Sequence, residues 1–407
     1  MKRYSKVTPE GTRDILFEEC SARRKVESTL SQLFKQLGYN RVITPAIEFF
    51  DVFDRESAGM RPESLYKLVD RRGRLLVLRP DNTMPIARMV ATRLKDMPMP
   101  VRLYYSQNVF RIHPGLSGRS DEIYQSGIEL MGASGIRADL EVITTAVEAL
   151  KRCGAPDFCL EISHAGIFNA IVSNLHVDAE IREDLTQLIE SKNYAALNDL
   201  LDKIGDSPET QAIRRMPRLF GGIEALDEAQ ALIQSEEASV ALSYLRTLYH
   251  RLSALETGAN IRIDLGQVHR GNYYTGVVFR GYIEGSGITV LNGGRYDHLT
   301  EEFDALLPAV GFGVEVDALA KAMLQRGEVE PPKKADVLVF GENGKEIQAV
   351  TYARSLSENG LSGENCVCET LEEAKAYASM HGIRRLDVVG DNGVTCITIA
   401  EGFYETN

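Results

Sequence analysis

The segment 124–130 carries an amide and a carboxylate at a spacing that could bind an ammonium group. Alternate residues of an extended strand share one face, so Gln125, Gly127 and Glu129 point the same way, and the opposite set, Ser126, Ile128 and Leu130, is mostly apolar. The glycine leaves room for a small ligand, and the two polar side chains supply hydrogen-bond acceptors for an ammonium group. On this segment alone, the solvated face of a half-buried sheet is the preferred interpretation.

A second group of polar side chains lies in the turn Arg79-Pro80-Asp81-Asn82-Thr83, directly after a short apolar segment. This turn could direct Asp81 and Thr83 into the same pocket as Glu129. The competing interpretation is an Asx-type helix cap, because an amphipathic helix is predicted from Met84. For the turn on its own, the cap is preferred.

Two further segments combine aromatic side chains with glycines. Tyr273 and Tyr274 are predicted to lie in a strand, where neighbouring side chains face opposite ways, so that one enters the core and the other a site. Residues 292–297 read Asn-Gly-Gly-Arg-Tyr-Asp, a turn that lets the backbone approach a ligand. It is not one of the glycine-rich phosphate loops. Ordinary strand aromatics and an ordinary turn are the alternatives.

The elements that must position these segments are short strands and amphipathic helices. A helix is predicted over 17–38, where apolar residues recur at helical spacing and Gly38 ends the pattern. Residues 165–257 are rich in Ala, Leu, Glu and Asp and predict a helical insert in the sheet. Strands are predicted over 42–45, 74–78, 101–110, 122–131, 260–265, 273–282 and 287–291, and further helices over 136–152 and 314–325.

The organisation along the chain predicts a first domain over 1–325, a linker over 326–334 and a small α/β domain over 335–407. The linker contains the sequence Gly-Glu-Val-Glu-Pro-Pro-Lys-Lys. The last domain alternates strands and helices.

Composition excludes some function classes. The 407 residues carry a net charge of −12, which does not favour a wide basic surface for nucleic acid. Six scattered cysteines form no C-x-x-C pair and have no histidine at metal-ligand spacing, so free thiols in the cytoplasm are predicted, with no metal and no cofactor. No apolar run is long enough for a membrane span.

Taken in order, these segments resemble class II histidyl-tRNA synthetases over about residues 6–320. The resemblance implies an α+β fold with a class II synthetase-like antiparallel sheet, flanking helices and a helical insert. It also implies a homodimer formed through motif 1, and a C-terminal domain that is a degenerate form of the anticodon-binding domain. The segments that carry the resemblance are Gly38 to Glu48 (motif 1), Phe110 to Glu129 (motif 2), Tyr273-Tyr274 (the histidine-specific segment), 292–297, and 308–312 (the start of motif 3).

The departures from the family fall on residues that bind ATP or the substrate carboxylate. The Glu of the motif 2 sequence Phe-Arg-x-Glu, which helps to hold ATP, is His113 here. The Arg that opens the histidine-specific segment and contacts the carboxylate aligns with His269, and the neighbouring Arg270 would face the other way in a strand. The motif 3 Arg that binds phosphate aligns with Ala318. Adenylation depends on neutralising these charges, so the departures predict a chain that does not catalyse it.

The amino-acid pocket is retained, apart from an Asp in place of a Glu at position 81. The resemblance implies that four residues hold the α-amino group of histidine, that the two tyrosines hold its imidazole, and that the motif 2 arginine belongs to the same pocket. These predicted histidine-binding residues are Asp81, Thr83, Arg111, Gln125, Glu129, Tyr273 and Tyr274.

A retained pocket without the ATP ligands resembles the regulatory subunits of ATP phosphoribosyltransferase. That resemblance implies a non-catalytic chain whose partners are a short catalytic subunit and L-histidine, in a hetero-oligomer that performs the first step of histidine biosynthesis. Histidine would bind either in this pocket or at the subunit interface. The alternatives are an active histidyl-tRNA synthetase and a tRNA-binding paralogue. Residues 333–407 hold seven lysines and arginines against twelve aspartates and glutamates, which disfavours tRNA.

Overall fold

The computed structural model describes residues 4–54, 62–113, 119–155, 157–255, 258–269, 273–284, 286–331 and 333–399. The chain divides into two compact units, Met1–Val329 and Glu330–Asn407. Within the described ranges, each helix is either too short or too polar to cross a membrane.

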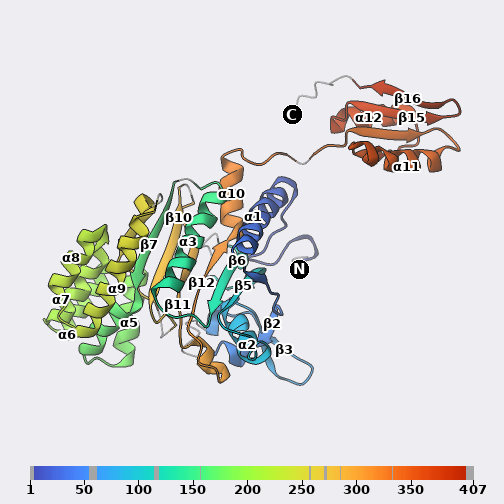
Figure 1. The fold of residues 1–407 in the computed structure, drawn as a ribbon. Coiled ribbons are helices and arrows are strands. Elements are labelled where there is room, and N and C mark those ends of the chain that lie inside the picture. The colour runs from blue at the N-terminus through green and yellow to red at the C-terminus, as the bar shows by residue number, and fades with distance from the viewer. Residues whose placement is uncertain are drawn as a thin grey trace. The chain divides into compact units, whose positions relative to one another are not determined.

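A nine-stranded sheet organises the first unit (Figure 1), in the order β1-β5-β6-β12-β11-β10-β7-β9-β8. The pairs β1–β5 and β7–β9 are parallel, and the other neighbours are antiparallel. The strands are β1 (Asn40–Arg41), β5 (Val101–Phe110), β6 (Glu122–Met131), β7 (Phe158–His164), β8 (Phe220–Gly221), β9 (Ile261–Asp264), β10 (Val277–Ile283), β11 (Thr289–Arg295) and β12 (Ala309–Glu315).

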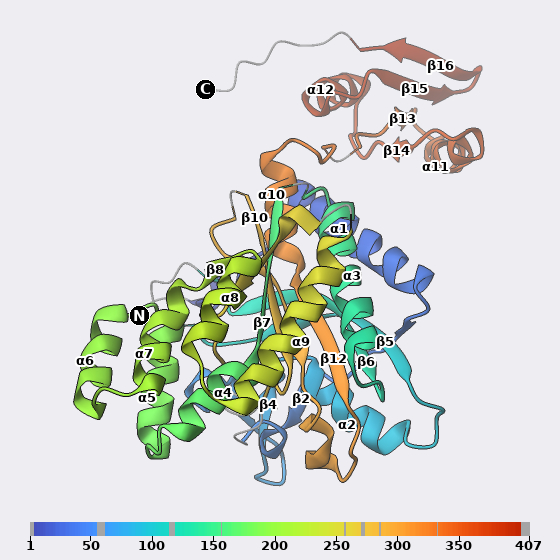
Figure 2. The same cartoon turned by 60° about the vertical axis from the view of Figure 1, so that its left-hand side comes forward.

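One face of this sheet packs against four helices to form the main core. Figure 2 shows two of them, α3 and α9, lying across the sheet. The helices are α1 (Phe17–Gln36), α3 (Ile136–Arg152), α9 (Glu236–Ser253) and α10 (Val316–Gln325). In α1 the apolar residues recur at helical spacing, so Phe34 lies on the buried stripe. Its ring packs on Tyr104 of β5 and Phe312 of β12, at centroid distances of 5.8 and 6.0 Å.

The opposite face of the sheet is covered by a second, smaller layer. That layer consists of α2 (Thr83–Arg93) and a three-stranded antiparallel sheet in the order β2-β4-β3. The strands are β2 (Ile47–Phe49), β3 (Lys67–Val69) and β4 (Leu75–Leu78). Tyr105 of β5 and Met84 of α2 belong to the apolar cluster between the two layers. The space between these layers holds the predicted site segments.

The region after β7 is helical, and its helices lie together at one end of the large sheet (Figure 1). A two-residue strand, β8, returns from it to pair with β9. The helices are α4 (Ala165–Asn174), α5 (Ala179–Glu190), α6 (Tyr194–Ile204), α7 (Pro208–Arg215), α8 (Ile223–Leu232) and α9.

The second unit contains a four-stranded sheet in the order β14-β13-β15-β16. One apolar cluster joins one set of side chains of this sheet to α11, and a separate cluster joins the alternate set to α12. The two helices therefore cover opposite faces of the sheet. The elements are β13 (Val337–Gly341), α11 (Glu346–Ser355), β14 (Gly363–Asn365), α12 (Leu371–His381), β15 (Arg385–Gly390) and β16 (Gly393–Thr398).

The structure differs from the sequence-based predictions in three places that matter for the site. Residues 292–295, predicted as part of a turn, belong to strand β11, which pairs with β10 and β12. Residues 42–45 are not a strand, and the edge strand β1 ends at Arg41. Pro45 has no backbone N–H to donate, which disfavours strand pairing at this point. Tyr273 and Tyr274 precede β10, which begins at Val277, so the prediction that they face opposite sides of a strand is wrong.

A buried ion pair ties α3 to the end of β11. Asp139 accepts hydrogen bonds from Nε and Nη2 of Arg295, at 2.8 and 2.6 Å, and one from the hydroxyl of Tyr244 on α9. The side chains of Arg295 and Asp139 are 7% and 0% exposed, and Arg295 also pairs with Asp297 at 2.8 Å, so removing Asp139 leaves the buried guanidinium only partly compensated.

We therefore expect Asp139→Ala to lower the free energy of unfolding by about 3 kcal/mol, at the lower end of the range for a broken buried pair, because Asp297 still compensates Arg295 in part. The matched control is Glu148→Ala, which breaks the exposed pair between Glu148 and Arg152 on the same helix. The control should cost about 0.5 kcal/mol or less. Urea-induced unfolding followed by circular dichroism measures both, and equal losses would contradict the assignment of the buried pair.

Candidate functional site

Strand register builds the floor of the site from three glycines. Glu129 of β6 lies opposite Gly311 of β12, and Gly127 lies opposite Gly313. Side chains of directly paired residues project from the same face, so Glu129 stands over a strip of bare backbone. A methyl group at position 311 would overlap Oε2 of Glu129, and one at 313 would lie 2.7 Å from Nε2 of Gln125. Only glycine permits this close approach.

Glu129 is a buried carboxylate whose charge is only partly satisfied. Its residue is 1% exposed, and Oε1 accepts a hydrogen bond of 2.8 Å from Oγ1 of Thr83. Oε2 has no hydrogen-bond partner among the described residues. Burial raises the pKa of Glu129 well above its usual value, and the nearby charge of Asp81 adds to that effect. The free oxygen is therefore an acceptor that lacks a donor.

Asp81 serves as a helix cap and also faces the pocket, so the two interpretations of its turn are compatible. Its Oδ1 accepts a hydrogen bond of 3.0 Å from the backbone N–H of Met84 in the first turn of α2. Burial raises the pKa of Asp81, while the positive charge of Arg111 opposes that rise. Arg111 is held in place by a hydrogen bond of 2.6 Å from its Nε to the carbonyl oxygen of Pro80.

A chain of amides holds Gln125 beside the glycine floor. Asn82 donates to Oε1 of Gln125 at 3.3 Å and accepts from Nε2 of Gln107 at 3.2 Å. The hydroxyl of Tyr105 also donates to Oε1 of Gln125, at 3.5 Å. The sequence interpretation did not include Tyr105, Asn82 or Gln107. Tyr105 reaches the site because β5 pairs it with Gly127, and that pairing is defined only by the tertiary structure.

Aromatic rings form a wall beside the carboxylates. The ring of Tyr273 lies edge-on to Tyr274 at a centroid distance of 4.7 Å, and its other neighbour is Tyr296, at 5.6 Å. Burial raises the pKa of Tyr273 and of Tyr274, so both hydroxyls stay protonated. The hydroxyl of Tyr296 has no hydrogen-bond partner among the described residues. It would also touch a methyl group at Gly311, so it lies close to the floor under Glu129.

The three positions that depart from the synthetase pattern have other roles. His113 bonds to Oδ1 of Asp121 through its backbone N–H at 3.0 Å and its Nδ1 at 3.3 Å. Ala318 packs against the main apolar core. His269 has a buried Nε2, and its ring lies 4.7 Å from that of Tyr274. Arg270 and the motif 2 loop at 114–118 lie outside the described residues.

The structure thus brings all seven predicted pocket residues to one region of the large sheet. Asp81 and Thr83 come from the start of α2, Gln125 and Glu129 from β6, and Arg111 directly follows β5. The two tyrosines come from the segment before β10.

Comparisons with known proteins agree on the fold and the family. The profile of a family described as "Histidyl-tRNA synthetase" matches residues 11–319. The ATP phosphoribosyltransferase regulatory subunit of Clostridium kluyveri is 38% identical over 391 residues, which covers 95% of this chain and 100% of the relative. The regulatory subunit of Bacillus cereus is 36% identical over 386 residues, covering 94% and 91%.

Solved structures indicate the same fold and the same family. A crystal structure described as an ATP phosphoribosyltransferase regulatory subunit/histidyl-tRNA synthetase from Bacillus halodurans is 31% identical. It superposes with a TM-score of 0.82 and covers 93% of this chain and 97% of its own. A histidyl-tRNA synthetase from Nostoc is 22% identical, with a TM-score of 0.73 and 96% of each chain covered, which shows the shared class II fold.

The unpaired carboxylate predicts a pH-dependent stability difference in the ligand-free chain. Glu129→Gln removes the buried charge, so the variant should be more stable than the wild type at about pH 8, by about 1 kcal/mol or more. Because burial raises the pKa of Glu129, the folded wild type takes up a proton as the pH falls. The stability of the wild type then rises. The difference in stability between the two proteins should therefore narrow as the pH approaches 4.5, the usual pKa of glutamate.

Urea-induced unfolding of both proteins across this pH range measures the gap. Glu122→Gln removes a carboxylate from the opposite face of the same strand and serves as the control. If Glu129→Gln were less stable than the wild type at every pH, the carboxylate would have a cationic partner in the ligand-free chain.

Proposed function

We propose, since the chain belongs to the family of ATP phosphoribosyltransferase regulatory subunits, that it is a non-catalytic subunit that binds L-histidine in the pocket around Glu129. In this proposal the chain acts with a catalytic ATP phosphoribosyltransferase subunit and makes that enzyme sensitive to histidine. The observation that carries the proposal is the unpaired Oε2 of Glu129 beside Asp81, in a pocket of retained amino-acid-binding residues.

The α-ammonium group of an amino acid fits this acidic end. Burial raises the energy of the charged form of both carboxylates, and the charge of Asp81 adds to that cost at Glu129. A ligand ammonium group supplies three N–H donors and a positive charge, so it offsets both effects in one step. The acceptors available to it are Oε2 of Glu129 and the second oxygen of Asp81, with the Thr83 hydroxyl beside them.

The aromatic wall suits the imidazole ring. The rings of Tyr273, Tyr274 and Tyr296 present flat apolar surfaces to a ligand ring. The hydroxyl of Tyr296 lacks a partner among the described residues, so it is free to bond a ring nitrogen. An amino acid with an aliphatic side chain would leave that hydroxyl unsatisfied, and an unmade bond of this kind costs about 1–3 kcal/mol.

The ATP half of the ancestral site supports the non-catalytic part of the proposal. His113 stands where the family has a Glu, and its ring and backbone are both engaged by Asp121. Ala318 has a methyl group in the apolar core where the family has an arginine. Neither residue can supply the charge that holds ATP and stabilises the adenylation transition state.

Regulation would be a coupling free energy between the histidine pocket and the surface that contacts the catalytic subunit. We place the chain in the cytoplasm, as a homodimer within a hetero-oligomer. The proposal locates inhibitory histidine in this pocket, and histidine at the subunit interface is the competing arrangement. We treat the second unit as a degenerate anticodon-binding domain, because an acidic balance disfavours tRNA.

Binding without chemistry is the expected result for the purified chain. Calorimetry should detect the binding of L-histidine to the wild type. Glu129→Ala should weaken that binding about tenfold or more, because a charge-assisted hydrogen bond is lost. Glu122→Ala, on the opposite face of β6, is the matched control and should bind as the wild type does. Histidine-dependent exchange between ATP and pyrophosphate should be absent. Exchange at a substantial rate would identify an active synthetase instead.

A second experiment separates the pocket from the interface. In the complex with the catalytic subunit, Glu129→Ala should retain phosphoribosyl-transfer activity but require about tenfold more histidine for inhibition. Steady-state rates at increasing histidine measure this, with Glu122→Ala again as the control. An unchanged inhibition curve, in a variant that no longer binds histidine alone, would place inhibitory histidine at the interface.

A further inference from the structure

Arg280 on β10 lies on the same face of the sheet as Glu129. The strand register pairs Arg280 with Asn292 of β11. It continues from Asn292 to Gly313 of β12 and from Gly313 to Gly127 of β6. Paired residues project from one face, so the four form a row across the sheet, three inter-strand spacings or about 14 Å long.

The middle of this row contains two glycines, and the hydroxyl of Tyr105 and the amide of Gln125 lie over them. Gly313 and Gly127 have no side chains, and Asn292 is exposed to solvent. The row therefore has the acidic group of Glu129 and Asp81 at one end, uncharged polar groups over its middle, and a guanidinium at the other end. This is a dipolar arrangement, and it suits a ligand that carries both an ammonium group and a carboxylate.

The contact between Arg280 and His269 determines which nitrogen of the imidazole carries a proton. Nη2 of Arg280 lies 3.5 Å from Nδ1 of His269. A guanidinium can only donate, so Nδ1 must be the acceptor and Nε2 must carry the hydrogen. Burial and the charge of Arg280 lower the pKa of His269 to about 3, which keeps the ring neutral. Nε2 is buried and has no partner among the described residues, so a donor is left without an acceptor.

The aromatic wall connects the two ends of the row. His269 packs on Tyr274 and Tyr274 on Tyr273, each at a centroid distance of 4.7 Å. The pKa of Tyr274, raised by burial, is lowered in part by Arg280 and raised further by Asp81. The charges at both ends of the row therefore act on this one tyrosine.

We propose that Arg280, together with Nε2–H of His269, binds the carboxylate of the amino-acid ligand. Arg280 would thereby supply the guanidinium that the family's pattern places at position 269 and that this chain lacks there. The inference rests on the proposed function, because it assigns a further binding residue to the same pocket. Its chemistry requires a free α-carboxylate, so amides and decarboxylated analogues should bind less well.

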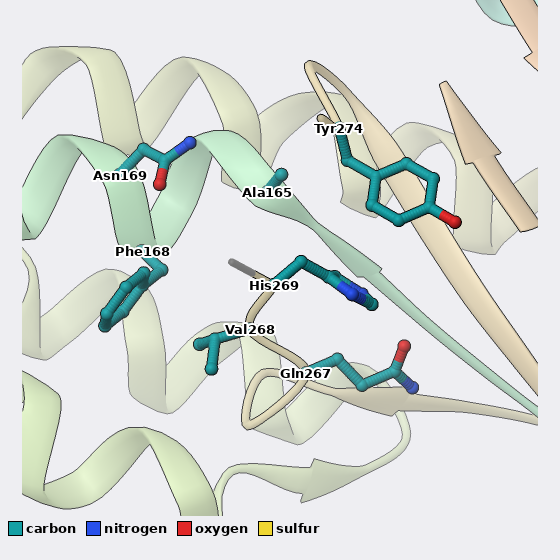
Figure 3. Close-up of a pocket in the computed structure, with 7 residues that line it drawn as sticks. All are labelled: Ala165, Phe168, Asn169, Gln267, Val268, His269 and Tyr274. Atoms are coloured by element: carbon teal, nitrogen blue, oxygen red, sulfur yellow. The ribbon is translucent and has the colours of Figure 1, made fainter. Parts of the chain in front are cut away.

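Two structural roles compete with this assignment. Arg280 lies beside Glu161 of β7 in the register and acts electrostatically on Glu161 and Asp264, so it could serve only to balance their charge. A cavity of about 10 Å³ adjoins His269 (Figure 3), with Gln267 and Tyr274 among its lining residues. It has room for about one water molecule, which could satisfy Nε2 instead of a ligand.

The test compares L-histidine with L-histidinamide, which keeps the ammonium group and the imidazole but has no carboxylate. Calorimetry on the full-length chain should show that the wild type prefers histidine by about tenfold or more. Arg280→Gln should lose most of that preference, because it should weaken the binding of histidine and leave the binding of the amide unchanged. Arg280→Lys should retain part of the preference. Arg262→Gln, on β9 two strands away, is the matched control and should keep the preference.

The outcomes distinguish the two proposals. A wild type that binds histidine without preferring it to the amide overturns the assignment of Arg280 and leaves the histidine pocket standing. Arg280→Gln with reduced thermal stability but an undiminished preference also overturns it, and supports charge balance with Glu161 and Asp264. A wild type that binds neither compound overturns the proposed function and this inference together. Unchanged amide binding in Arg280→Gln would show that the variant is folded.

Discussion

The burial of a carboxylate without a protein cation is the constraint on which the site depends. Moving a charged group out of water is costly, and Glu129 has one oxygen bonded to Thr83 and the other unpaired among the described residues. The surrounding sheet tolerates this because its strands are paired on both sides and its opposite face packs on a large core. Rigid positioning of a poorly satisfied group lets a ligand gain free energy by satisfying it.

In the proposed function, the two halves of the synthetase-like site differ in what their side chains do. On the amino-acid side, polar groups lie over glycines, and Oε2 of Glu129 has no hydrogen-bond partner among the described residues. At the positions predicted to have lost their ATP-binding groups, His113 pairs with Asp121 and Ala318 packs against the core. A protein that keeps one half can sense an amino acid without activating it, because binding needs only ground-state contacts whereas catalysis needs groups that neutralise transition-state charge.

Particular residues show where sequence interpretation succeeded and where it stopped. Helix α1 and strands β5 and β6 follow from apolar periodicity, and their bounds lie within two residues of the prediction. Asp81 was interpreted as either a cap or a pocket residue; one of its carboxylate oxygens accepts a hydrogen bond from Met84, as a cap does, and its role in the pocket stays a prediction. The two tyrosines were placed in a strand that begins only at Val277, so their orientation was wrong.

The sequence by itself determined the family and the fold class, because short motifs in a fixed order specify a scaffold, and it predicted seven residues of the pocket. Only the tertiary structure decided which residues share the face of Glu129, since strand order and register are set by pairings between distant segments. Tyr105 and Arg280 lie far from Glu129 in sequence, and no local pattern marks them. Their place in the site follows from cross-strand pairing, which sequence periodicity alone does not encode.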